Sequence, residues 1–439
     1  MHRVTLSMTT VIILSAALHA ENVDNNIAQE AESLTQQNIK VKSVRGILGG
    51  FDPLEHSKGQ IRAGYITLSP DAGARTTDYA LGGHYHFDTK RWNGLQLGAS
   101  VYTVLNMGIN QNPNHINGDF FDEEQKSFVL LSKAFLDGKW GNTEIKLGRQ
   151  SLDTPHADSD DIRMIPNFFE AYTISNNDIK DLTLSAGYIN RMAGWENTVN
   201  ARKFTDVGDT IAANFDNERA RESQGIAYAS ARYEGIENLS LSLWYYNYQD
   251  IANVIYAEAG YEKIFDNKNT LTFGLQYDVS TETGAALLGE QNAETFGLSA
   301  DFMFETVGVH ILAAYNQDNG NTGATGLSLG GGPFFTSMED QTLDAIGQAG
   351  SAWLIGVGYH FEKVGIHGLH AGIAYGNFQA DNSNDYVSKE LDAVIDYSYN
   401  EQFSLTAAYA SVRFDHMLDN NEYLLADYDQ FRVITNYNF

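Results

Sequence analysis

The amino-acid sequence predicts an all-β fold, a transmembrane antiparallel β-barrel of about 18 strands. Apolar and polar residues alternate along many short segments, and the connections between these segments are alternately short and long. The chain also ends in a strand, Phe431–Phe439, with one apolar face and an aromatic last residue. Such a strand suits a wall with lipid on one side and water on the other.

The N-terminal residues resemble an export signal. Arg3 precedes a short apolar core at Met8–Leu18, and small residues allow cleavage after Ala20, so residues 1–20 are interpreted as a signal peptide. This core is too short to span a bilayer as a helix. We expect residues 21–57 to form a periplasmic segment and residues 58–439 to form the barrel, in the outer membrane of a Gram-negative bacterium.

Period-two alternation identifies the strands. In residues 239–246 Leu and Tyr alternate mainly with Ser, and residues 271–278 and 295–302 have the same period. The polar positions are rich in Gly, Ser and Thr, which suits a crowded, hydrated inner wall. Aromatic residues lie near the strand ends, as expected for the two interfaces of a membrane.

The connections set the topology. Tight turns are expected near residues 88–94, 137–142, 176–181, 235–238, 266–269, 305–308, 362–368 and 400–402. Mostly longer connections lie at about 106–124, 151–167, 192–222, 280–294, 317–350, 379–389 and 415–428, with two short ones near 70–74 and 249–252. Strands at 60–69 and 429–439 complete an even number, which places both ends of the barrel on the periplasmic side.

Composition excludes several classes of protein. The net charge of -28 argues against a nucleic-acid partner. The absence of cysteine excludes a disulfide scaffold and a thiolate metal site. Acidic residues cluster at Asp119–Glu124 and Asp415–Asp429, either as solvated loops or as ligands for divalent cations that bridge lipopolysaccharide.

Two motifs carry a resemblance to a known family. The segment Leu147–Pro155 leads into Asp158–Glu170, which has the pattern Asp-x-Arg-x-x-Pro-x-x-Phe at residues 161–169. Later, Gly350–Trp353 is followed by Tyr359 and by Gly365–Leu369. Together these segments resemble the OprD-like outer-membrane porins, and with the strand count the likeness covers nearly the whole chain after residue 58.

The resemblance implies a diffusion channel, monomeric or loosely trimeric, whose third extracellular loop folds inward and narrows the pore. In the family a column of basic wall residues faces acidic loop residues. Opposed rows of charge can orient a small polar solute and replace part of its hydration. The candidate constriction residues here are Arg62, Lys146, Arg149, Asp158, Asp160, Asp161, Arg163, Arg191 and Arg432.

Strand parity supports part of this set. Arg62, Lys146, Arg191 and Arg432 alternate with apolar residues or share the phase of Gly, Ser and Thr, so we expect them to point inward. A cation facing lipid would cost about 2–4 kcal/mol at mid-bilayer. Each Arg could instead pair with a wall carboxylate and only hold the barrel's shape. The acid excess makes mild cation preference as plausible as carboxylate uptake.

Other readings of the loop and of possible ligand sites are weaker. Asp158, Asp160 and Asp161 could cap a turn, and a calcium loop is a further reading that lacks the EF-hand spacing. His84 and His86 make only half a metal site, and His360, His367 and His370 crowd one tight turn. Gly326–Pro333 lacks the lysine of a phosphate loop and is interpreted as a flexible extracellular loop. We expect no cofactor.

The sequence therefore predicts a porin for small water-soluble solutes and not an enzyme. The alternative is an acidic structural or adhesive barrel with little transport; a barrel phospholipase or protease is a third class. The expected partners are outer-membrane lipid, lipopolysaccharide, small polar solutes and the barrel-assembly machinery, which would read the C-terminal strand ending in Phe439.

Overall fold

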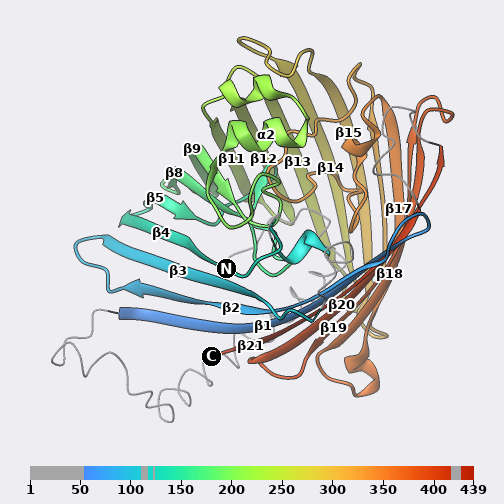
Figure 1. Ribbon diagram of the computed structural model, residues 1–439, viewed down its shortest axis with the longest axis horizontal. Coiled ribbons are helices and arrows are strands. Elements are labelled where there is room, and N and C mark those ends of the chain that lie inside the picture. Colours follow the sequence, from blue (N-terminus) through green and yellow to red (C-terminus); the bar gives the residue numbers. More distant parts are fainter. Residues whose placement is uncertain (1–53, 110–116, 122–123, 417–426) are drawn as a thin grey trace.

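The described residues form one closed antiparallel sheet. The computed structural model describes residues 54–109, 117–121, 124–416 and 427–439. Nineteen strands join in one sheet, and β1 pairs with β21, so the sheet closes on itself (Figure 1). The wall strands are β1 (Leu54–Pro70), β2 (Thr76–Thr89), β3 (Leu95–Asn106), β4 (Phe128–Trp140), β5 (Thr143–Gln150), β8 (Phe168–Asn176), β9 (Leu182–Ala193), β11 (Ile226–Ile236), β12 (Leu239–Tyr248), β13 (Ala252–Ile264), β14 (Thr270–Glu282), β15 (Asn292–Phe304), β16 (Val309–Asp318), β17 (Gly350–His360), β18 (Leu369–Ala380), β19 (Val387–Ser398), β20 (Phe403–His416) and β21 (Tyr428–Asn438).

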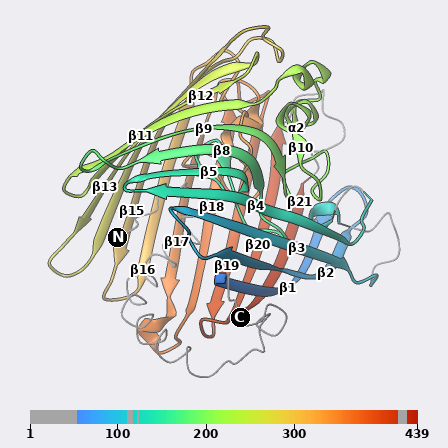
Figure 2. The same cartoon turned by 90° about the vertical axis from the view of Figure 1, so that its left-hand side faces the viewer.

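The remaining elements are short. The two-residue β10 (Thr205–Asp206) extends the sheet beside β9, near α2 (Val207–Asn214) (Figure 2). β6 (Asp153–Thr154) and β7 (Ala157–Asp158) form a small separate hairpin. The 3-10 helices are η4 (Gly118–Phe120), η5 (Glu218–Glu222), η6 (Leu343–Ile346) and η7 (Phe361–Val364). Within the described ranges, no helix has the length and apolar character needed to cross a membrane.

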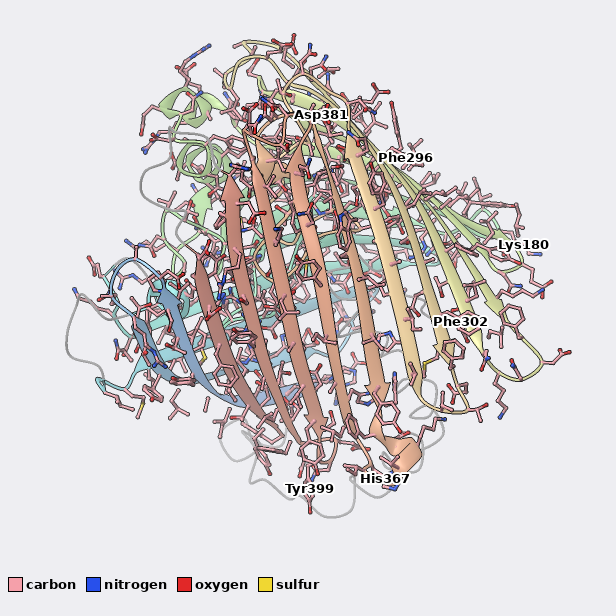
Figure 3. The ribbon with its side chains drawn as sticks, turned by 90° about the vertical axis from the view of Figure 1, so that its right-hand side faces the viewer. Lys180, Phe296, Phe302, His367, Asp381 and Tyr399 are labelled. Carbon is pink, nitrogen blue, oxygen red and sulfur yellow. The ribbon has the colours of Figure 1, made fainter. Side chains whose placement is uncertain are left out.

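Tight turns gather at one end of the barrel and longer connections at the other. His367 and Tyr399 lie in turns at one end, whereas Asp381 lies at the opposite end (Figure 3). The eight expected tight turns all join consecutive strands, which confirms the predicted barrel of about 18 strands. β1 begins at Leu54, earlier than the expected residue 58. The proposed signal peptide and most of the periplasmic segment lie outside the described residues.

Side chains alternate between the two faces of the wall as the pattern predicted. On β14, Phe273, Leu275 and Tyr277 are 47%, 51% and 39% exposed, whereas Gln276 and Asp278 are buried. Phe296 and Phe302 lie on the outer surface of β15 near its two ends (Figure 3). This outer apolar surface is the face that meets lipid in a membrane barrel.

The barrel closes where the C-terminus meets β1. Gly59 and Phe439 exchange two backbone hydrogen bonds, of 2.8 and 2.9 Å. A Cβ on Gly59 would lie 2.3 Å from the Phe439 ring, so the ring lies directly over this glycine on the outer face. The terminal aromatic therefore packs at the seam between the first and last strands.

Three of the longer connections fold over or into the barrel. We name residues 151–167 the third loop, residues 194–225 the fourth loop and residues 319–349 the seventh loop, in order along the chain. Leu327 and Leu329 of the seventh loop are 1% and 2% exposed and pack in one apolar cluster with Ala157 of the third loop. The interpretation of Gly326–Pro333 as a flexible extracellular loop is therefore wrong, because this segment packs inside the barrel against the third loop.

Candidate functional site

The third and seventh loops meet inside the barrel. The nitrogen of Leu329 donates to the oxygen of His156 at 2.9 Å, and Ala157 and Leu329 form a parallel bridge. Farther along the seventh loop, Phe334, Phe335 and Met338 pack against apolar residues of β17 and β18. The lumen is thus narrowed by two loops that support each other, where the sequence predicted one.

Arg62 of β1 holds the third loop to the seam. Its two terminal nitrogens lie 2.5 and 2.8 Å from the two carboxylate oxygens of Asp161, and one of them also donates to the Arg163 oxygen at 2.7 Å. The Arg62 Nε donates to Asn436 of β21 at 2.8 Å. Arg62 is only 3% exposed. Its orientation is inward, as expected, but its charge is used to bind the loop.

Arg432 of β21 makes the equivalent contact with the seventh loop. It donates to Glu339 at 2.7 Å, and the two side chains are 4% and 10% exposed. On the same strand, Gln430 donates to both oxygens of Asp340 at 2.9 and 2.7 Å. Arg432 also points inward, as expected, and it too is paired with a loop carboxylate.

The buried Glu390 of β19 anchors the next turn of the seventh loop. Its carboxylate accepts the backbone N–H groups of Asp340 and Gln341 at 2.9 and 2.7 Å. Together with the Arg432 contact, this fixes residues 339–341 against β19 and β21, the two strands that flank β20.

Arg163 lies at the bend of the third loop. It is 4% exposed, its Nε lies 3.4 Å from Asp119, and its guanidinium lies 4.8 Å from the centre of the Trp195 ring. Arg163 of the third loop therefore contacts the connection between β3 and β4 through Asp119 and the fourth loop through Trp195, whose aromatic face adds a cation–π contact.

Several carboxyl groups of the loops have raised pKa values. Burial, with the nearby charges of Asp153 and Asp160, raises the pKa of Asp158 to about 7. Burial and the charge of Glu339 raise the pKa of Asp160 to about 6. Burial and the charge of Asp160 raise the pKa of Glu196 to about 8, although Glu196 accepts hydrogen bonds from Asn167 and Gly331.

These loops surround a cavity of about 690 Å³. Its lining includes several glycines of the seventh loop, together with Trp195 and Phe215. The charged lining residues are five acids and one arginine: Asp160, Glu196, Glu339, Asp340, Asp344 and Arg163. Because Arg163 is buried and paired, the cavity presents mainly carboxyl groups.

Arg149 and Arg191 do not lie at this constriction. Arg149, Glu170 and Arg191 are register partners across β5, β8 and β9 and share one face of the sheet. On β5 and β8 that face also carries Leu147 and Tyr172, which are 40% and 48% exposed. The row is on the outer face, where Arg191 also pairs with Asp206 at 2.8 Å.

The inward orientation predicted for Arg191 is wrong because of a β-bulge. Glu170 pairs with Arg191 and Ala171 pairs with Ile189, so Asn190 is left without a partner on β8. One extra residue reverses the faces of all later side chains. Strand parity counted along the sequence cannot detect this change.

Two lysines of the wall point into the lumen on the periplasmic side of the third loop. Lys146 points inward as expected, with its Nζ 5.1 Å from the centre of the Phe135 ring and 3.8 Å from Glu144. Sequence reasoning missed Lys133, whose Nζ lies 6.0 Å from the Phe168 ring. A register shift at Ser132 interrupts the alternation of β4, so its pattern did not reveal this inward lysine.

The histidines make polar contacts in the wall. His86 lies 3.0 Å from Asp88. His360 and His370 face each other with ring centres 4.4 Å apart, and His310 of β16 lies 6.0 Å from His360. Of the three histidines at the tight turn, His360 and His370 pair across the start and end of the turn, and His367 is exposed on it. Nowhere in residues 54–109, 117–121, 124–416 and 427–439 are three or more His, Asp or Glu placed to hold a metal ion.

Comparison with known proteins agrees with this architecture. The model of the outer membrane porin, OprD family, matches residues 121–439. The chain belongs to this family. The protein is therefore an integral porin of the outer membrane of a Gram-negative bacterium and not an enzyme. Among curated proteins it is 23% identical over 244 residues to Porin D of Pseudomonas aeruginosa, an alignment that spans about half of either chain, 54% of this one and 52% of Porin D.

Solved structures share the fold. OpdK of Pseudomonas aeruginosa, solved with vanillate, has a TM-score of 0.71 at 18% identity, covering 88% of this chain and 100% of that one. OccK9 (OpdG) of the same species has a TM-score of 0.73 at 20% identity, covering 88% and 98%. OccAB1 of Acinetobacter baumannii has a TM-score of 0.69 at 16% identity, covering 87% and 96%.

Proposed function

We propose that this porin passes small polar solutes through the cavity between the third, fourth and seventh loops, and that it favours solutes with a positively charged group. The observation that carries the proposal is the imbalance of charge in the cavity, whose lining includes five acids and one buried arginine. Arg62 and Arg432, which a solute carboxylate would need, are 3% and 4% exposed and already bound to loop acids.

Two of the lining acids, Glu339 and Asp160, carry negative charge at neutral pH. Burial alone would raise the pKa of Glu339, but the charges of Arg432 and Arg163 hold it below its usual value. The pKa of Asp160 is about 6, so this group is mostly ionised at pH 7. Charged groups of one sign in a narrow, partly enclosed passage concentrate mobile ions of the other sign.

Within the constriction set, we propose that Asp160, Asp161, Arg163, Arg62 and Arg432 form the narrow region, with Lys146 on its periplasmic side. Asp158 would add a carboxyl group to the narrow region, at the base of the hairpin formed by β6 and β7. Arg149 and Arg191 are left out because they lie on the outer face.

The reversal potential across a KCl gradient in a planar bilayer tests the selectivity. We expect the wild-type channel to prefer K⁺ over Cl⁻. A unit charge about 4 Å away in water contributes about 1 kcal/mol, so Asp160→Asn should lower the permeability ratio by roughly fivefold or less. Asp206→Asn, on the outer face, is the matched control and should leave the ratio unchanged. An anion-selective wild-type channel would refute the proposal.

We also propose that the C-terminal strand with Phe439 is the part read by the barrel-assembly machinery, because Phe439 packs on Gly59 at the closing seam. The acidic loop residues would bind lipopolysaccharide through divalent cations.

The assembly would be a monomer or a loose homotrimer. Size-exclusion chromatography with light scattering in detergent tests the last statement. The acidic adhesive barrel is not favoured, since the chain belongs to a porin family.

A further inference from the structure

We infer that His156 and Asp278 form a proton-dependent latch that holds the third and seventh loops in the lumen. The inference rests on the proposed function, because it concerns regulation of the same passage. It starts from one contact. The His156 Nε2 lies 2.6 Å from Asp278 Oδ2 of β14, and both side chains are fully buried.

The second imidazole nitrogen reaches the other loop. His156 Nδ1 lies 3.1 Å from the backbone oxygen of Leu327, which also accepts a hydrogen bond from the Tyr248 hydroxyl. One side chain of the third loop thus joins the barrel wall to the seventh loop. It is the point at which both inward loops and β14 meet.

The chemistry of these atoms requires a proton between His156 and Asp278. A carbonyl oxygen only accepts, so Nδ1 must carry hydrogen to bond Leu327. At 2.6 Å, Nε2 and Oδ2 must then share a proton, whether it is assigned to the imidazole or to the carboxyl group. Without that proton, a nitrogen lone pair would face a buried carboxylate, a contact that is strongly unfavourable.

Several other titratable groups lie around the pair. The neighbouring titratable groups are the hydroxyls of Tyr246 and Tyr248 on β12 and Tyr256 on β13, the carboxyl groups of Asp318 on β16 and Asp344 in the seventh loop, and Glu258, which accepts from Tyr256. Asp344 interacts electrostatically with both His156 and Asp278, and Asp318 interacts with Asp278.

The sign of the pH effect follows from linkage. The latched contact contains one proton between Nε2 and Oδ2, and a released imidazole exposed to water can give that proton up. Opening then releases one proton, so the ratio of open to latched channels should rise with pH, by at most about tenfold per pH unit. Lower pH favours the closed loops.

Two substitutions distinguish the loss of the shared proton from the loss of the whole contact between His156 and Asp278. In Asp278→Asn, the amide can donate to Nε2 of a neutral imidazole while Nδ1 still donates to Leu327. This variant should keep the latch and lose its pH dependence. His156→Ala should remove the latch at every pH. His86→Gln is the control, because His86 also pairs with an aspartate in the lumen but touches neither loop hairpin.

The measurement is the distribution of single-channel conductance levels between pH 5 and 9 in planar bilayers. Wild-type and His86→Gln should shift toward the larger level as pH rises, Asp278→Asn should stay at the smaller level, and His156→Ala should stay at the larger. A wild-type distribution that does not change with pH, or an Asp278→Asn variant that follows the wild type, overturns the latch.

A second readout is independent of conduction. The chain has no cysteine, so Ser328→Cys in the seventh loop can carry a single spin label. Its mobility should increase with pH in the wild-type background and not in Asp278→Asn. If the label responds but no current flows, the channel proposal fails and the latch stands; if current flows and the label never responds, the latch fails.

Discussion

Arg62 on the first strand binds both carboxylate oxygens of Asp161, which lies 99 residues later in the third loop, at 2.5 and 2.8 Å. The same guanidinium reaches Asn436 on the last strand. One side chain therefore connects the closing seam of the barrel with the loop that narrows it. This arrangement explains why an inward arginine need not be a solute-binding group.

Releasing this contact should widen the channel. Arg62→Gln removes charge-assisted hydrogen bonds worth about 1.5–3 kcal/mol, so the population with a detached third loop should rise by roughly tenfold to a hundredfold. Single-channel recordings should show longer or more frequent high-conductance states. Arg191→Gln, which removes an ion pair on the outer face, is the control. Identical traces for the two variants would contradict the role of Arg62 as an anchor.

Cation preference should increase with pH through Glu196. Its pKa of about 8 means that it is mostly protonated at pH 7 and gains its charge between pH 7 and 9. Asp160, with a pKa of about 6, adds an earlier step. Reversal potentials recorded from pH 5 to 9 should show both steps, and Glu196→Gln should remove only the upper one. If the reversal potential of Glu196→Gln depends on pH in the same way as that of the wild type, this assignment is refuted.

The raised pKa of Glu196 also makes the free energy of unfolding depend on pH. The folded-state pKa of Glu196, about 8, lies above the ordinary glutamate value of 4.5, so folding takes up a proton between these two pH values. The free energy of unfolding should therefore fall as pH rises from about 4.5 to 8, and less so in Glu196→Gln. Urea titrations of the folded barrel in detergent would measure the difference.

A side chain at residue 59 should impair closure of the barrel. In Gly59→Val the new Cβ would lie within 2.3 Å of the Phe439 ring, which must then move from the seam. We expect less folded protein in the outer membrane, measured by heat-modifiable mobility on gels. Ala63→Val, at an exposed outer position of the same strand, should assemble normally. Normal assembly of Gly59→Val would show that the Phe439 contact is dispensable.

The strand pattern and the inward positions of Arg62 and Arg432 could be predicted because regular strands repeat every two residues. The prediction failed where one extra residue at Asn190 broke that repeat and turned Arg191 outward. It also failed for the seventh loop, whose glycine-rich segment has no periodicity. Its packing depends on contacts with the third loop and with β17 and β18, which local sequence does not encode.

By itself, the sequence determined that this chain forms a barrel with an apolar exterior, tight turns at one end and longer loops at the other, since alternation and turn residues act locally. Only the tertiary structure decided how the lumen is used. The pairing of Arg62 with Asp161, of Arg432 with Glu339 and of His156 with Asp278 joins residues far apart in the chain. Such pairs depend on how the closed wall places its inner face against the loops. Whether a charged residue holds a loop in place or lines the pore is therefore decided only when the chain folds.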